Sequence, residues 1–184
     1  MGTLSRRFDS IVYGRGLCFG MVATALACYM GHSAGQPLSE LSPDPDLIAT
    51  LRRYHVRQYR PKVVLAAVYD WVRSLGGRPD RTVDRIRSAG VDSNPHVLCF
   101  GPGPDRNFFR CLAQAHAVVP YRIETSQEER RVYIYDPNYP RDRERCVVFQ
   151  RDESGRFGEF RYDRFGTNER WRISLIPSRA FGVS

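Results

Sequence analysis

The sequence predicts an α+β fold, with a helical N-terminal half packed on an antiparallel sheet made by the C-terminal half. Apolar residues recur at helical spacing in residues 18–90, whereas short apolar and aromatic runs bounded by turn residues fill residues 97–177. The 184 residues contain no internal repeat and no long low-complexity linker. We therefore expect a single domain over residues 1–184, with its helical half at about 10–92 and its sheet half at about 96–178.

Four helices are expected in the first half. The first runs from Cys18 to Met30, carries no charge and ends at Gly31. At about four turns it is too short to cross a bilayer, so it should be the buried central helix. The others are predicted from the Asp44-Pro45 cap signal, from Pro61 to the pair of glycines at 76–77, and over 80–88. The apolar residues that recur at helical spacing in the third are Val64, Leu65, Val68, Trp71, Val72 and Leu75.

About six strands are expected in the second half, at 97–100, 116–119, 131–135, 146–150, 157–162 and 171–176. A helical turn or two is predicted near 107–113, and turns are predicted at Gly155 and at 166–168. Aromatic residues in the later strands alternate with arginines, as on a half-exposed sheet. These are Phe149, Phe157, Phe160, Tyr162 and Trp171.

Composition excludes several classes of protein. The net charge is +8, and all 28 basic residues except Lys62 are arginines, but they are scattered, which disfavours nucleic-acid binding. Five cysteines without a Cys-x-x-Cys pair disfavour a disulfide framework and a zinc site, so neither a metal nor a cofactor is expected. No membrane span or secretory signal is found. We expect a cytoplasmic protein, or a catalytic module of a larger exported one.

Cys18 is the first residue that points to chemistry. It follows a loop containing Gly14 and Gly16 and begins an apolar helix. A thiol at a helix N-terminus faces unpaired N–H groups and the positive end of the helix dipole, and both favour the nucleophilic thiolate. A core cysteine that merely begins a buried helix is the alternative. Cys28 is a weaker candidate because it lies in the middle of the same helix.

His116 and Asp136 supply the partners that a nucleophilic cysteine needs. His116 begins an apolar strand, and Asp136 ends the strand 132–135 and precedes Pro137. If these strands pair, the carboxylate lies beside the imidazole, where it can fix the tautomer and stabilise the imidazolium. Read separately, they are a strand histidine and a turn aspartate. Together with Cys18, they form a candidate catalytic triad.

Three segments carry a family resemblance: Gly-Leu-Cys-Phe-Gly-Met at 16–21, His-Ala-Val-Val at 116–119 and Tyr-Ile-Tyr-Asp-Pro-Asn at 133–138. Their order and spacing resemble the papain-like cysteine peptidase superfamily, and most closely its branch of bacterial, bacteriocin-processing leader peptidases. The resemblance implies a papain-like fold with a cleft between the halves. It also implies a thiol protease with a peptide or protein substrate, using Cys18 as nucleophile, His116 as base and acid, and Asp136 as the orienting group.

The sequence departs from this family at one position and leaves the acyl acceptor open. Such peptidases usually carry a glutamine shortly before the cysteine as an oxyanion donor, and residues 11–17 contain none. Tyr13, Arg15 or Gln114 are the candidate substitutes. Transglutaminase-like enzymes, acyltransferases and deamidases use the same order of residues and the same acyl-thioester. A noncatalytic binding module is the remaining alternative.

Asn138 competes with Asp136 for the third position, because an asparagine serves that role in papain. Asp136 is preferred since it directly ends a strand, whereas Asn138 follows a proline that turns the chain. A carboxylate also stabilises an imidazolium more than a neutral amide does.

Overall fold

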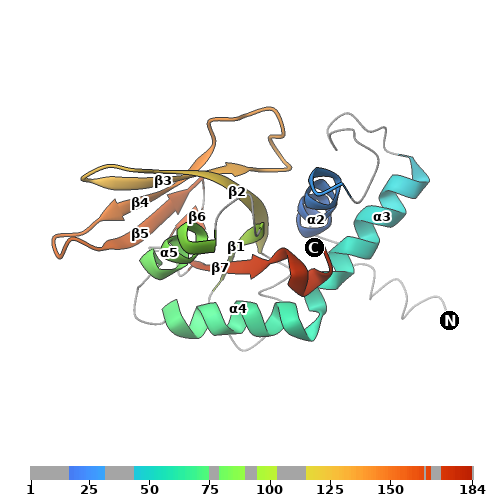
Figure 1. Ribbon diagram of the computed structural model, residues 1–184, viewed down its shortest axis with the longest axis horizontal. Helices are drawn as coiled ribbons and strands as arrows, with labels where there is room; N and C mark the ends of the chain where they lie inside the picture. The colour runs from blue at the N-terminus through green and yellow to red at the C-terminus, as the bar shows by residue number, and fades with distance from the viewer. Residues whose placement is uncertain are drawn as a thin grey trace.

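The computed structural model describes residues 17–31, 44–74, 79–89, 95–102, 115–163, 165–166 and 171–183, and these form an α+β protein (Figure 1). The α-helices in these ranges are α2 (Cys18–Tyr29), α3 (Pro45–Val56), α4 (Pro61–Ser74) and α5 (Asp80–Ala89). The strands are β1 (His96–Pro102), β2 (His116–Thr125), β3 (Glu129–Tyr135), β4 (Cys146–Arg151), β5 (Phe157–Tyr162), β6 (Phe165–Gly166) and β7 (Trp171–Pro177). Two short 3-10 helices are η2 (Arg57–Tyr59) and η4 (Ser178–Phe181). None of these helices is both long and apolar enough to span a membrane.

The strands form one antiparallel sheet in the order β6-β5-β4-β3-β2-β1-β7. The sheet curls strongly, so its two edge strands approach each other. Phe165 of β6 packs edge-on against Trp171 of β7, with ring centroids 4.8 Å apart. The sheet is therefore almost closed into a barrel.

Two expected details of the strands were wrong. The second strand runs to Thr125 rather than ending at residue 119, because its outer part pairs with β3 as far as Arg130. Gly166, expected in a turn, lies in the two-residue strand β6 and pairs with Arg161. The helical turn expected near residues 107–113 lies outside the described residues.

The central strands are buried on both faces, which explains why β1 is apolar at successive positions. Leu98 and Phe100 of β1 face a core shared with α5 and the curled strands β3 to β6. Val97 and Cys99 face a second core made with α2, α4 and the C-terminal segment. Alternate residues of a strand point to opposite faces, so the sheet separates the two cores. Figure 1 shows α2 beside the sheet and α4 beneath β7.

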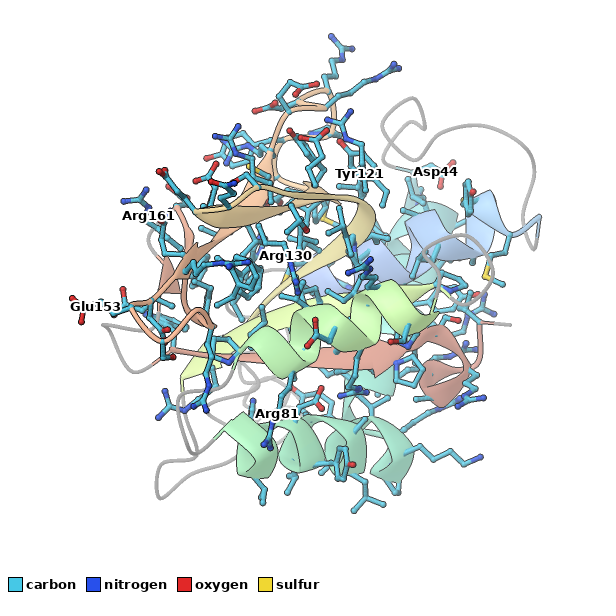
Figure 2. The ribbon with its side chains drawn as sticks, turned by 60° about the vertical axis from the view of Figure 1, so that its left-hand side comes forward. Asp44, Arg81, Tyr121, Arg130, Glu153 and Arg161 are labelled. Atoms are coloured by element: carbon cyan, nitrogen blue, oxygen red, sulfur yellow. The ribbon has the colours of Figure 1, made fainter. Side chains whose placement is uncertain are left out.

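Buried and half-buried polar contacts fix the helices to the sheet. Asp70 of α4 accepts a hydrogen bond from the backbone N–H of Leu175 on the edge strand β7 (2.7 Å). The same carboxylate forms an ion pair with Arg85 of α5. Arg130 of β3 pairs with Asp84 of α5 (2.8 Å) and points from the sheet toward that helix (Figure 2). Each buried polar group left without its hydrogen bond would lower the stability of the fold by about 1–3 kcal/mol.

Helix α4 presents a different face to the core than its sequence indicated. Its buried residues are Val63, Ala67, Asp70 and Trp71, whereas Leu65 and Val72 are 67% and 60% exposed. Apolar residues occur all round this helix, so the pattern alone leaves its orientation undetermined. The hydrogen bond of Asp70 to β7 requires the observed face to point inward.

Gly20 allows α2 to pack closely against α3. A Cβ at this position would collide with the backbone oxygen of Leu51 and would lie 3.0 Å from the Cβ of His55. His55 is itself buried and bonded to Gln58 (2.8 Å between the two Nε2 atoms), so it cannot move aside freely. This contact sets the position of α2, and therefore of Cys18.

We expect Gly20→Ala to destabilise the protein by about 1–3 kcal/mol, because backbone atoms cannot yield as a side chain can. The free energy of unfolding in urea measures this loss. Gly158→Ala is the matched control, since a Cβ there would meet only the movable carboxylate of Asp152 at 3.0 Å. Equal stability of the two variants would contradict the proposed contact.

Candidate active site

Cys18 lies at the first position of α2, where its thiol meets the start of strand β2. Among the described residues no side chain caps this helix, and its first turn holds no acidic residue, so its positive end is not neutralised. The half-buried thiol donates to the backbone oxygen of Ala115, 3.5 Å away. Ala115 immediately precedes His116, so the helix start and the strand start are in contact.

The pairing of β2 with β3 brings His116 and Asp136 together. Val119 pairs with Tyr135, which places Asp136 level with Val118, and His116 is two residues further along the same face. The Nε2 atom of His116 lies 2.9 Å from Oδ2 of Asp136. Because Nε2 faces the carboxylate, Nδ1 is the ring nitrogen left for Cys18, which acts with Asp136 to raise the pKa of this ring.

The carboxylate of Asp136 is 1% exposed and is held by three donors. Oδ2 accepts from His116 and from the hydroxyl of Tyr162, and Oδ1 accepts from the backbone N–H of Asn138 (2.8 Å). Burial raises the pKa of Asp136, but the bonds to His116, Tyr162 and Asn138 outweigh it and leave this pKa below its usual value. Asp136 is therefore an anion at neutral pH.

Asn138 contributes its backbone and not its side chain. Residue 138 is exposed, and its N–H closes a turn on Asp136. The side chain bonded to His116 is that of Asp136. His116 and Asp136 are thus joined by a hydrogen bond, and the thiol of Cys18 contacts Ala115, the residue before His116.

The surroundings of His116 favour the protonated, charged form of its imidazole. Burial lowers its pKa, but the hydrogen bonds and charges of Asp136 and Cys18 raise it more, to about 9. A folded-state pKa above the ordinary value of 6.5 means that protonated His116 stabilises the fold below about pH 6.5. That contribution is lost as the pH rises through about 9.

Aromatic rings fix the plane of the imidazole. The rings of Phe165 and Tyr162 are stacked nearly parallel to His116, with centroids 5.6 Å and 6.4 Å away. Both rings are buried. They keep water from the His116–Asp136 bond and so strengthen it.

Tyr162 is the residue of this site that the sequence did not reveal. In the sequence it is one of several aromatic residues that alternate with arginines, and it lies 26 positions from Asp136. Two intervening strand pairings, β3 with β4 and β4 with β5, bring it to the carboxylate. No local motif signals such a contact.

The candidate oxyanion side chains Tyr13, Arg15 and Gln114 lie outside the described residues. The backbone N–H of Cys18, at the start of α2, is a candidate donor for an oxyanion. No cluster of three or more metal-binding side chains occurs within the described ranges.

Comparison with known proteins adds no relative. No protein-family model matches the chain, and neither a curated protein nor a solved structure matches it.

We expect Asp136→Asn to lower the pKa of His116 from about 9, because burial is then opposed by Cys18 without the carboxylate. The titration of the His116 ring followed by NMR measures this change. Asn138→Ala is the control and should leave the pKa unchanged, since the bond to Asp136 comes from the backbone. An equal fall of the His116 pKa in both variants would contradict the assignment of Asp136 as the partner of His116.

Proposed function

We propose that the protein is a papain-like cysteine peptidase that cleaves a peptide or protein substrate through an acyl-thioester on Cys18. The observation that carries the proposal is the array of a helix-starting thiol, a buried imidazole and a buried carboxylate. The order of these residues, and the layout of helices followed by an antiparallel sheet, support placing the chain in that superfamily.

Cys18 is the nucleophile in this mechanism. With the imidazole protonated, the thiol proton resides on His116 and the sulfur is a thiolate at the positive end of α2. The sulfur attacks the carbonyl carbon of the scissile amide, and the carbonyl oxygen becomes an oxyanion. The backbone N–H of Cys18 is placed to stabilise that charge.

His116 then transfers its proton to the leaving nitrogen. The C–N bond breaks, the amine departs, and the acyl group stays on sulfur as a thioester. A water molecule next attacks the thioester while neutral His116 accepts one of its protons. The C–S bond breaks, the acid leaves, and the thiolate–imidazolium pair is restored. Asp136 keeps the ring oriented through both halves.

The thiol environments support the assignment of Cys18 over other cysteines. Burial raises the pKa of the thiols of Cys99 and Cys146, so both resist ionisation. Cys28 is half-buried on the same helix as Cys18, but it lies in the last turn rather than in the middle as expected, and there the helix dipole disfavours an anion. Cys18 alone among these four lies at a helix N-terminus beside a histidine.

We expect iodoacetamide at about pH 6 to alkylate Cys18 ahead of the other cysteines, since an imidazolium neighbour maintains its thiolate. Peptide mapping by mass spectrometry identifies the modified residue. Uniform labelling of all five cysteines, or none before unfolding, would rule out Cys18 as the nucleophile.

We also expect Cys18→Ala to abolish cleavage of a peptide library, with a loss of at least about 10³ in kcat/KM because no nucleophile remains. Cys28→Ala is the matched control on the same helix and should retain activity. Transfer of the acyl group to an added amine, or release of ammonia without backbone cleavage, would instead identify an acyltransferase or a deamidase. Unchanged partner binding by Cys18→Ala without any turnover would identify a binding module.

A further inference from the structure

The carboxylate oxygen that accepts from His116 also accepts from Tyr162. Oδ2 of Asp136 receives the imidazole N–H at 2.9 Å and the phenol O–H of Tyr162 at the same time. The remaining oxygen is occupied by the N–H of Asn138. The side chains of Asp136 and Tyr162 are 1% and 5% exposed, so water does not replace either bond readily.

Arg145 supports the phenol from the other side. Its NH1 atom donates to the hydroxyl oxygen of Tyr162 at 3.3 Å, and its Nε lies 3.1 Å from a carboxylate oxygen of Asp142. Its guanidinium also lies over the ring of Tyr139, 3.3 Å from the centroid. A cation bonded to the phenol oxygen makes its O–H a stronger donor to Asp136.

We propose that Tyr162, backed by Arg145, is a positioning residue that holds Asp136 and limits how strongly this carboxylate binds the proton of His116. The proposal rests on the proposed function of the Cys18 site and adds two residues to it. It gives the site a hydrogen-bonded chain of four side chains, from Arg145 through Tyr162 and Asp136 to His116, whose pKa Cys18 also raises.

Two donors on one oxygen compete for its electron density. The phenol stabilises the anion of Asp136, so the carboxylate gains less from binding an imidazolium than it would alone. His116 consequently stays acidic enough to give its proton to a leaving amine, as the mechanism requires. Burial, followed by the carboxylate of Asp136, raises the pKa of Tyr162, so the phenol keeps its proton while the enzyme works.

Other titratable groups near this pair come from several elements. Cys18 of α2 raises the pKa of His116, and Cys99 of β1 interacts with Cys18 and with Asp70 of α4. Tyr135 of β3 interacts with Asp136. The substitutions below leave all of these in place, except that the titration uses Cys18→Ala so that no second proton is exchanged with the thiol.

The test is an NMR titration of the His116 ring in Cys18→Ala protein that also carries Tyr162→Phe. Phenylalanine keeps the ring that packs against Phe100 and His116 and removes only the hydroxyl. The matched control is Tyr133→Phe, which deletes a phenol bonded to Glu124 at 2.8 Å on another part of the sheet. Both proteins are checked for native folding before titration.

We expect Tyr162→Phe to raise the pKa of His116 by at least about 0.5 relative to the control, because Oδ2 becomes a better acceptor. In protein with Cys18 intact, kcat should fall roughly threefold to tenfold, since a more basic imidazolium protonates the leaving group less readily. A His116 pKa identical in the two variants would overturn the role of Tyr162. A raised pKa in a protein that cleaves no peptide would refute the proposed peptidase and leave the Tyr162 contact intact.

A second variant, at Arg145, tests the outer end of this series of hydrogen-bonded side chains without altering the core. Arg145→Met keeps the aliphatic part of the side chain and should raise the pKa of His116 by less than Tyr162→Phe does. Arg161→Met removes an equal charge next to Tyr162 in the sequence, on an exposed residue that points away from the sheet (Figure 2). Equal effects of Arg145→Met and Arg161→Met would show that net charge alone acts, and would remove Arg145 from the proposal.

Discussion

The antiparallel pairing of β2 with β3 is the constraint on which the site depends. Its last described pair, Val119 with Tyr135, determines that His116 and Asp136 leave the sheet on one face and within hydrogen-bond distance. A slip of one residue would turn Asp136 to the opposite face, because side chains alternate along a strand. The pair is held in register by Val118 and Ile134, both fully buried in the same core.

Helix α2 depends on that pairing in turn. Its N-terminus meets the start of β2 through the contact of Cys18 with Ala115, and its other side packs on α3 at Gly20. The thiol is therefore located by a close backbone approach on one side and by a strand end on the other. A site built from the ends of rigid elements needs no flexible loop to hold its groups in place.

Two buried carboxylates show how this fold uses charge. Asp70 accepts from Leu175 and Arg85 and joins α4, β7 and α5, so its bonds serve the framework. Asp136 accepts from His116, Tyr162 and Asn138, and its bonds orient an imidazole. A buried carboxylate without such donors would cost several kcal/mol, so each must be satisfied completely. The functional difference lies in the partner, since the imidazolium of His116, with a pKa of about 9, can give up its proton and a guanidinium cannot.

The sequence by itself determined the α+β class, the start of each helix and the three residues that converge. These are local properties: Pro45 and Pro61 begin helices, an uncharged apolar run begins at Cys18, and Asp136 directly ends a strand. The tertiary structure decided which face of α4 is buried, how far β2 extends, and that Tyr162 reaches the carboxylate with Arg145 bonded to its phenol. Each of those depends on contacts between residues distant in the chain. An amphipathic pattern does not encode such contacts, because several packings bury similar apolar area and hydrogen bonds between particular partners select among them.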